Sequence, residues 1–300
     1  MRSLSHFLTN PKDLLSSLLK KNGKYIQDSL YLQWQYSLQM GKKLDLKDPK
    51  TFTEKIQWLK IHNRQSVMTT MVDKYAVKEY VGNRIGFKYI IPTIGVWNSL
   101  KEVDWDSLPN QFVLKTTHGG GGTGVVVVKD KSKADKKITL EKLRWSFNRE
   151  GYTANREWPY KNVPKRIIAE ELIEIPNKSD LTDYKIFCFN GKPTYIQVIQ
   201  DRNTCETIDF FDTEWNHQDF VGLNPIAQNA DTPIARPKDL KEMLWIAEEL
   251  SKDIPFVRID LYQTDKGVLF GEITFFPASG IGRFRPAEWD IKLGDMLTLP

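Results

Sequence analysis

Apolar residues recur at helical spacing through the first third of the chain. One such stretch covers residues 11–23, with Asn10 as the expected cap, and a second covers residues 28–41. Residues 51–54, Thr-Phe-Thr-Glu, have the spacing of a capping box, in which two side chains bond each other's backbone N–H groups. A further helix is expected over residues 73–82. These patterns predict a helical N-terminal region.

Short apolar runs bounded by turn residues replace this spacing after residue 90. Paired runs of this kind are typical of antiparallel hairpins, and one pair flanks Asn190-Gly191, the strongest short hairpin signal. Helices are expected from Thr139, as the cap, to about Asn148, and from Pro237 to about Leu250. Helices followed by hairpins with interleaved helices indicate an α+β or a mixed α/β fold. The predicted strands cover residues 112–116, 125–128, 167–169, 184–189, 194–200, 256–262 and 268–274.

Composition supports a folded chain and leaves its partner open. The 300 residues are 40% hydrophobic and 12% aromatic, which supplies enough large side chains for a core and excludes a disordered protein. The net charge of +5 favours anionic partners. The charge alone does not select among the possible anionic partners, which are nucleotide phosphates, acidic sugars, anionic lipid and nucleic acid.

No segment reads as a membrane span or a secretory signal. No apolar run approaches the ~20 residues that a spanning helix needs, and the N-terminus lacks a long hydrophobic signal region. Residues 14–19 could lie on a membrane surface as an amphipathic helix, although packing against the rest of the protein is the favoured interpretation. Cys188 and Cys205 are too few for a disulfide framework, and Cys188 lies in an apolar run typical of a core. We therefore expect a reducing, cytoplasmic location.

The segment Gly119-Gly120-Gly121-Gly122-Thr123-Gly124 is the most unusual in the chain. Glycines permit positive φ and let backbone N–H groups approach phosphate oxygens. A P-loop is excluded because no lysine follows Gly124, and a dinucleotide-binding turn is excluded because a strand former follows instead of a helix. The protein-kinase glycine loop matches locally, but H-R-D and D-F-G are absent. With Lys115 before it, the segment predicts a flap over phosphates, and a plain surface hairpin is the alternative.

The last predicted hairpin carries charged residues at alternate positions. Arg258 and Asp260 share one face of their strand, as do Glu272 and Thr274 on the next, because side chains two apart point the same way. The two carboxylates come close around the turn and repel each other unless a positive charge lies between them. Mg²⁺ prefers oxygen ligands and is commonly held by one or two carboxylates plus substrate phosphates. The hairpin predicts a magnesium site, with a simple cross-strand arginine–carboxylate pair as the alternative.

Taken in order, these segments resemble the ATP-grasp superfamily. The resemblance rests on Lys115 with the glycine flap, then on residues 170–173, 183–185, 258–260 and 272–274. Within that superfamily the chain resembles the TupA-like ATP-grasp family, associated with capsular and teichuronopeptide-type polysaccharide synthesis. The closer match is carried by residues 53–58, 73–77, 112–115 and 272–277.

This resemblance implies an ATP-grasp fold whose antiparallel-sheet subdomains clamp ATP. We expect residues 1–72 to form the helical N-terminal region, residues 73–165 the glycine-flap subdomain, and residues 166–300 the C-terminal subdomain with the metal site. The flap would close over the β- and γ-phosphates. The other residues implied for nucleotide binding are Lys74 and Lys115 at adenine or the α-phosphate, Glu170, Glu171, Leu172 and Ile173 at the adenine edge, Asp183 at ribose, and Lys185 near the phosphates.

The resemblance also implies a metal site and a substrate site. Asp260 and Glu272 would hold Mg²⁺, while Arg258 and Lys185 would assist the transfer of phosphate. Thr274 stands where many ATP-grasp ligases carry asparagine, and its hydroxyl can still offer an oxygen to metal. One metal and two metals are the alternatives. His118 beside the flap, together with Arg283 and Arg285, would contact substrate, the arginines through a carboxylate.

The implied activity is that of an ATP-dependent ligase. A substrate carboxylate would be phosphorylated, and an amine would attack the acyl phosphate to give an amide. The expected substrates are an acidic saccharide and an amine such as an amino acid or amino sugar, with no role for nucleic acid. Peripheral association with a membrane polysaccharide assembly system is compatible with these substrates. A sugar kinase using the same grip on ATP, or a glycosyltransferase or basic polymer-binding protein, are the alternatives.

Overall fold

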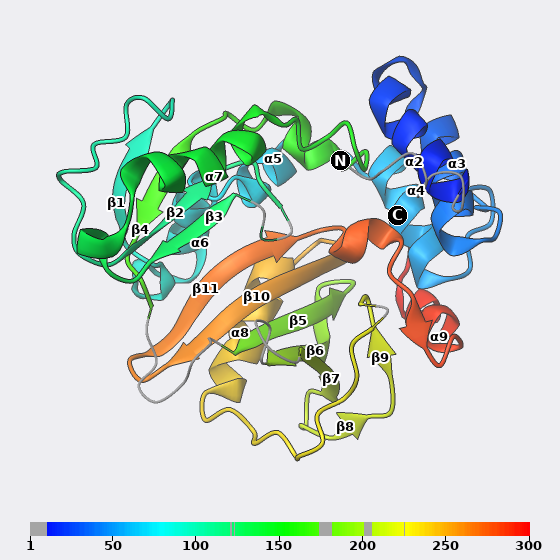
Figure 1. The fold of residues 1–300 in the computed structure, drawn as a ribbon. Helices are drawn as coiled ribbons and strands as arrows, with labels where there is room; N and C mark the ends of the chain where they lie inside the picture. Colours follow the sequence, from blue (N-terminus) through cyan, green and yellow to red (C-terminus); the bar gives the residue numbers. More distant parts are fainter. Residues whose placement is uncertain (1–10, 121, 123, 174–181, 201–205, 225) are drawn as a thin grey trace.

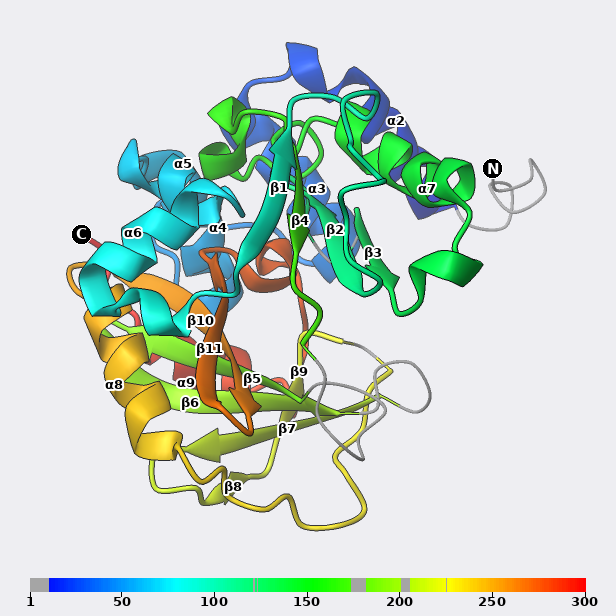
Figure 2. The ribbon, with the colours of Figure 1, turned by 90° about the vertical axis from the view of Figure 1, so that its left-hand side faces the viewer.

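The computed structural model describes residues 11–120, 122, 124–173, 182–200, 206–224 and 226–300. The predicted cap Asn10, the loop residues Gly121 and Thr123, and Cys205 lie outside the described residues. Two sheets and an N-terminal group of helices make up the molecule (Figure 1). In both views the smaller sheet lies over β10 and β11 of the larger sheet (Figures 1 and 2).

The N-terminal helices form a small cluster with its own core. They are α2 (Pro11–Asn22), α3 (Asp28–Met40) and α4 (Phe52–His62), with the 3₁₀ turn η1 (Gly23–Tyr25) between the first two. The capping box is confirmed, since Thr51 and Glu54 bond each other's backbone N–H groups. Gly41 ends α3 at φ +75°, a left-handed conformation that glycine adopts without strain. Leu19, Tyr31, Leu32, Tyr36 and Leu44 form the core of the cluster.

Residues 14–19 face both inward and outward. Ser16 and Leu19 are buried, whereas Leu14, Leu15 and Leu18 are between 40% and 53% exposed. Packing of one side against the cluster therefore agrees with the favoured interpretation. No helix of the described residues is both long enough and apolar enough to cross a bilayer.

The smaller sheet has four antiparallel strands in the order β1-β4-β2-β3. These are β1 (Thr93–Trp97), β2 (Phe112–Thr116), β3 (Val125–Val128) and β4 (Ile167–Glu170), and helix α7 (Lys136–Asn148) packs on β2 and β3. The glycine-rich segment connects β2 to β3 as predicted, while β1 was not expected from the sequence. The sequence analysis places a subdomain boundary between residues 165 and 166. Strand β4 follows that boundary but pairs with β1 and β2 of the smaller sheet.

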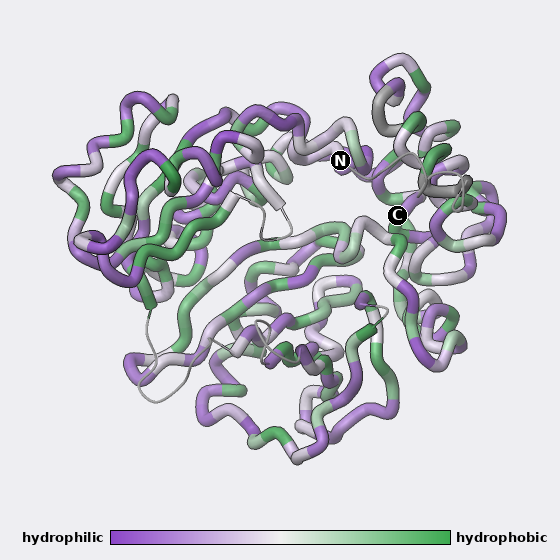
Figure 3. The backbone as a smooth tube through the Cα atoms, in the orientation of Figure 1, coloured by the Kyte–Doolittle hydropathy of each residue, from purple (hydrophilic) through white to green (hydrophobic). Residues whose placement is uncertain are grey.

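The larger sheet has six antiparallel strands in the order β11-β10-β5-β6-β7-β8. Helix α8 (Leu240–Ser251) packs on β5, β6 and β10, and helices α5 (Val67–Val72) and α6 (Ala76–Ile85) join the same core. Hydrophobic residues follow the strands of this sheet, as Figure 3 shows. The strands are β5 (Asp183–Phe189), β6 (Lys192–Gln200), β7 (Thr207–Asp212), β8 (His217–Gln218), β10 (Phe256–Thr264) and β11 (Gly267–Thr274).

The remaining elements border the larger sheet. Strands β9 (Val221–Gly222) and β12 (Phe284–Arg285) pair with each other, and helix α9 (Trp289–Met296) follows them. The remaining 3₁₀ turns are η2 (Phe87–Tyr89), η3 (Lys131–Lys133), η4 (Trp158–Asn162) and η5 (Pro277–Gly280).

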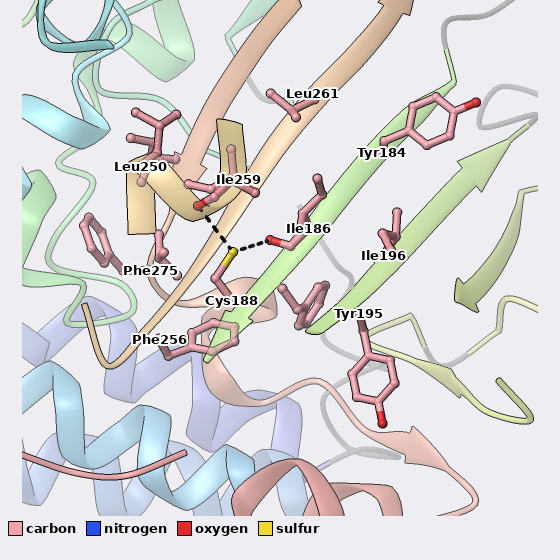
Figure 4. Packing of buried hydrophobic residues seen from close by; sticks show 14 of the residues in the cluster. Tyr184, Ile186, Cys188, Tyr195, Ile196, Leu250, Phe256, Ile259, Leu261 and Phe275 are labelled. Atoms are coloured by element: carbon pink, nitrogen blue, oxygen red, sulfur yellow. Dashed lines mark hydrogen bonds between the residues drawn. The ribbon is translucent and has the colours of Figure 1, made fainter. Parts of the chain in front are cut away.

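Cys188 lies in the core of the larger sheet, as the sequence predicts. Its Sγ is 3.8 Å from the carbonyl oxygens of Ile186 and Ala247, among the apolar side chains drawn in Figure 4. Burial raises the pKa of this thiol to about 12. The residue is therefore a small packing group and not a nucleophile.

Three predicted helix starts are wrong. Helix α7 is capped by Asp135, which accepts the N–H of Ile138, and Thr139 is buried inside the helix. Helix α6 begins at Ala76 although Asp73 accepts its first N–H groups, and α8 begins at Leu240, three residues after Pro237.

The predicted end of α6 is also wrong, because Gly82 lies inside the helix. A Cβ at Gly82 would lie 2.5 Å from the ring of Phe87, so this glycine serves close packing. Helix α6 continues to Ile85, and Gly86 at φ +111° follows as the terminating residue.

Candidate active site

A cavity of about 410 Å³ lies between the two sheets. The smaller sheet contributes Lys115 and Glu170, and the larger sheet contributes the charged ends of β5, β10 and β11. Apolar side chains line another part, among them Val77, Ile91 and Phe270. The cavity therefore has one charged region and one region suited to a flat apolar group.

Glu170 is the charged centre of the smaller sheet's side of this cavity. It is 4% exposed, and its carboxylate pairs with Lys115 and, at 2.6 Å, with Lys78. Burial raises the pKa of Glu170, but the charges of Lys115 and Lys78 outweigh it and lower the pKa below the ordinary value. Glu170 is thus an anion that holds two lysines at the cavity wall.

Lys78 is a cavity residue that the sequence analysis missed. It lies on α6, four residues after Lys74, which is in the turn that precedes this helix. Its Nζ also donates to the carbonyl oxygen of Ile91 at 2.6 Å, and burial lowers its pKa. The four-residue spacing from Lys74 was the signal that could have identified it.

The metal-site hairpin has the predicted register. Asp260 lies directly opposite Glu272, and Arg258 lies opposite Thr274. Arg258 donates Nε to Asp260 Oδ1 at 2.6 Å and Nη2 to Asp260 Oδ2 at 2.7 Å. Its Nη2 also reaches Glu272 Oε1 at 3.4 Å and Thr274 Oγ1 at 3.2 Å. One guanidinium therefore bridges all three residues that the sequence assigns to metal.

Two lysines complete the charge balance around these carboxylates. Lys185 lies beside Asp260 in the neighbouring strand and pairs with its Oδ2, while Lys74 Nζ is 3.4 Å from Glu272 Oε2. Burial acts to raise the pKa of Glu272, but Lys74, Lys185 and Arg258 hold it well below its usual range. Burial raises the pKa of Asp260, and the adjacent Arg258 and Lys185 oppose that shift.

The donor set at this hairpin fits magnesium bound together with phosphates. Asp260 and Glu272 offer carboxylate oxygens and Thr274 a hydroxyl oxygen, the hard ligands that Mg²⁺ takes. Among the described residues no group of three or more His, Cys, Asp and Glu side chains could by itself hold a metal ion. Two carboxylates match a metal that takes its other ligands from phosphates and water.

The described part of the glycine loop borders the same cavity. Gly119 and Gly122 line it, and Gly122 and Gly124 have φ of +73° and +83°. A Cβ at Gly124 would overlap the hydroxyl groups of Thr116 and Ser146, so glycine is required there by close approach as well as by conformation.

A second cavity, of about 310 Å³, continues from the first. The two share Gly119 and Glu272, and Arg258 and Thr274 also face the second cavity. Ser279 from η5 forms part of the far wall. The metal-site hairpin therefore separates two connected spaces, one on each side of Glu272.

His118 and Glu157 are among the titratable side chains that line this second cavity. His118 is 3% exposed, and its Nε2 lies 3.2 Å from the carbonyl oxygen of Ser146. Its Nδ1 is buried and has no hydrogen-bond partner in the part of the chain that the structure describes. Glu157, which the sequence analysis missed, accepts the Ser279 hydroxyl at 2.5 Å. Burial raises the pKa of Glu157, against the opposing charge of Lys60. No local motif surrounds Glu157, so the sequence carried no signal for it.

Some predicted residues lie apart from these cavities. Arg283 and Arg285 are exposed and donate to the carbonyl oxygens of Gln39 and Ala227, and neither lines either cavity. Residues 171–173 follow β4 and are not among the described residues that line the first cavity. The backbone N–H of Glu171 donates to the carbonyl oxygen of Pro92. The residues that the structure does bring together are Lys74, Lys115, Gly119, Gly122, Glu170, Asp183, Lys185, Asp260 and Glu272 in the first cavity and His118, Gly119, Gly120, Arg258, Glu272 and Thr274 in the second.

Comparison with known proteins gives one strong match. The family model described as TupA-like ATPgrasp matches residues 54–298, which is more than half of the chain. Comparison with curated proteins gives no significant match.

Several solved structures are similar in part. D-alanine–D-alanine ligase from Bacillus anthracis is 19% identical with a TM-score of 0.42, over 70% of this chain and 58% of that chain. The same ligase complexed with ATP is 17% identical with a TM-score of 0.40, over 69% and 54%. The Helicobacter pylori ligase is 16% identical with a TM-score of 0.42, over 83% and 70%. The chain thus spans 58% and 54% of the first two structures, and likenesses this weak add nothing to the family match.

Proposed function

We propose, since this chain belongs to the TupA-like ATP-grasp family, that it is an ATP-dependent ligase that joins a carboxylate to an amine. The observation that carries the proposal is the pair of cavities joined at Glu272. The first cavity is lined by cations and apolar groups that suit a nucleotide. The second cavity is lined by Glu272 as well, and by Arg258. Such an arrangement places a phosphoryl donor and its acceptor on the two sides of one metal-binding hairpin.

ATP occupies the first cavity in this proposal. Val77, Ile91 and Phe270 supply an apolar surface for adenine. The segment Glu171–Ile173, which follows β4, is the proposed partner of the adenine edge. Asp183 faces ribose. Lys74, Lys115 and Lys185 neutralise phosphate charge, and the loop of residues 119–124 covers the phosphates.

Magnesium is held by Asp260 and Glu272, with Thr274 as a further oxygen ligand, and when bound it neutralises charge that builds up on the phosphates. Arg258 and Lys185 both pair with the carboxylate of Asp260. Their positive charges therefore lie beside the proposed position of the ATP phosphates. They stabilise the negative charge of the phosphoryl group during transfer. These cations and metal ligands lie on three adjacent strands, β5, β10 and β11.

The proposed reaction has two steps. A carboxylate oxygen of the acid substrate attacks the γ-phosphorus of ATP, which breaks the bond to ADP and gives an acyl phosphate. The amine nitrogen then attacks the acyl carbon, phosphate leaves, and the nitrogen loses a proton to give the amide. The second cavity holds both reactants, and its walls contribute chiefly by positioning them.

We further propose that the acid is an acidic saccharide and that the amine is an amino acid or amino sugar. The net charge of +5 supports an anionic partner. The resemblance to a family associated with surface polysaccharides supports a saccharide, a cytoplasmic setting where ATP is available, and contact with a membrane-bound assembly system. Arg283 and Arg285 are exposed, so any role for them in substrate binding requires a substrate that extends beyond the second cavity.

Asp260→Asn tests the metal and phosphate part of this proposal. The change removes a ligand charge and leaves Lys185 and Arg258 undercompensated, so ADP formation from Mg-ATP with uronic acids and amino acids is expected to fall about 100-fold or more. Asp265→Asn, on the exposed turn of the same hairpin, is the matched control and should retain full activity. Circular dichroism checks that both variants fold.

Trapping with hydroxylamine tests the order of events. With the amine omitted, hydroxylamine should convert the acyl phosphate to a hydroxamate, which a ligase yields and a sugar kinase does not. A stable product heavier by one phosphate would favour the kinase alternative. If Asp260→Asn left ADP formation unchanged, or if no acid and amine pair stimulated it while Mg-ATP bound, the ligase proposal would be wrong.

A further inference from the structure

A third cavity, of about 520 Å³, opens next to the second. The two share His118, Glu150, Gly151 and Tyr160, so a single molecule can extend from one to the other. The third cavity takes its other walls from η1 and from the chain around η4. Its described lining residues include none of those that line the first cavity.

The lining of this cavity is strongly basic. It includes Lys24, Lys161 and Lys165, and Glu150 is the only acid among its described lining residues. None of the three lysines forms an ion pair within the part of the chain that the structure describes, in contrast to Lys74, which pairs with Glu272. Unpaired cations gathered around a concave surface attract an anionic group.

His118 provides a second, independent indication of a ligand. Its Nε2 faces a carbonyl oxygen, which accepts only, so Nε2 carries the proton and a neutral ring leaves a lone pair on Nδ1. That Nδ1 is buried and has no hydrogen-bond partner among the described residues, on a side chain that is 3% exposed and lines both cavities. Burial and then the charge of Lys165 lower the pKa of His118, which keeps the ring neutral. A neutral Nδ1 accepts a hydrogen bond from a hydroxyl group.

We propose that the third cavity is a subsite for a second anionic group of the acid substrate, a phosphate or a carboxylate, bound by Lys24, Lys161 and Lys165. A sugar hydroxyl at the passage between the cavities donates to His118 Nδ1. The substrate class is then a saccharide with two anionic groups, one at the reaction site and one among the lysines. The identity of the reacting carboxylate rests on the proposed function. The anion subsite itself rests only on the third cavity and its lining.

The first experiment uses inorganic phosphate as the probe. The chain has four histidines, so the ring signals are few and His118→Gln identifies that of His118 by proton NMR. With the nucleotide site saturated by Mg-ADP, phosphate should shift the His118 signal in a saturable manner. Lys161→Ala/Lys165→Ala should weaken that binding about tenfold, because two of the three cations are removed.

The matched control is Lys136→Ala/Lys137→Ala, two exposed lysines at the start of α7 that line none of the three cavities. This variant should bind phosphate as the unaltered protein does. The subsite is refuted if phosphate leaves the His118 signal unmoved, or if the two double variants respond alike.

The second experiment separates phosphate from carboxylate as the anion. Calorimetry compares glucuronic acid, which has one carboxylate, with two doubly anionic probes. Glucuronic acid 1-phosphate adds a phosphate to the carboxylate, and digalacturonic acid adds a second carboxylate. At least one doubly anionic probe should bind about tenfold more tightly than glucuronic acid, and Lys161→Ala/Lys165→Ala should abolish that difference. Equal affinity for all three probes overturns the proposal.

The outcomes also distinguish the two proposals. Loss of the anion subsite leaves Mg-ADP binding as it is, because no described residue lines both the third cavity and the nucleotide cavity. Absence of Mg-ADP binding contradicts the proposed function instead. In that case the phosphate titration is run on the nucleotide-free protein and still decides the subsite.

Discussion

Lys60 is a charged side chain held in the interior between the N-terminal helices and the active site. It is 0% exposed, and its Nζ donates to the carbonyl oxygens of Asn155 at 2.9 Å and Ser279 at 2.8 Å. Burial lowers its pKa to about 8, with the charge of Glu157 opposing the shift. The ammonium fixes two segments of the second cavity's wall, at the cost of desolvating a charge.

This lowered pKa predicts a specific dependence of stability on pH. Between about pH 8 and 10.5 folded Lys60 has lost its proton while unfolded Lys60 retains it, so the unfolded state binds more protons and stability rises with pH. The contribution amounts to about 3 kcal/mol across that interval. Lys60→Met removes it, so the variant should gain less stability than the unaltered protein between pH 7.5 and pH 10 in urea unfolding.

Lys55→Met is the matched control for that measurement. Lys55 is on the same helix and donates to two backbone carbonyl oxygens, those of Gly294 and Leu297, but is only partly buried. Curves for Lys60→Met and the unaltered protein that ran parallel across the pH range would contradict the prediction.

At the scale of elements, helix α7 shows what decides a helix start. Asp135 accepts the N–H of Ile138 at 2.9 Å and so satisfies one of the free donors of the first turn. Asp135→Ala should lower the free energy of unfolding by about 1 kcal/mol, measured by urea denaturation. Lys136→Ala, the next residue and equally exposed, makes no cap and should leave stability unchanged or slightly higher. An equal loss in both variants would argue against the cap.

At the scale of the whole molecule, the N-terminal helices support the wall of the reaction cavity. Tyr31 donates to the carbonyl oxygen of Ala154 at 2.8 Å, and Gln35 donates to the same oxygen and to Asn155 Oδ1, both at 3.1 Å. Arg156 pairs with Asp28 at 3.0 Å and is almost entirely buried. The helices thus hold residues 154–156 in place beside the second cavity.

Gln35→Ala is expected to loosen that wall without affecting the nucleotide cavity. Loss of two hydrogen bonds, each contributing about 1 kcal/mol, should speed amide exchange in residues 150–157 by about tenfold or more. The dissociation constant of Mg-ADP should stay the same. Gln39→Ala, one turn later on α3 with a bond to Ser16 Oγ instead, is the control. Unchanged exchange in Gln35→Ala would show that the helices do not support this segment.

The sequence by itself determined the reactive face of one hairpin and many of the helices and strands, although not β1. Alternation of side chains is a local property of a strand, so the shared face of Arg258 and Asp260 and its approach to Glu272 followed from spacing alone. The sequence also predicted the glycine-rich connection between two strands and the capping box at Thr51, because both depend only on residues close together in the chain.

The tertiary structure decided which distant elements meet. Lys185 reaches Asp260 through strand pairing, Glu157 reaches the second cavity through the path of a loop, and Lys24 joins Lys161 across more than a hundred residues. Arg283, close in sequence to the metal-site strand, instead contacts α3. These placements depend on how sheets and helices pack, and the period of a local hydrophobic pattern carries no information about that packing.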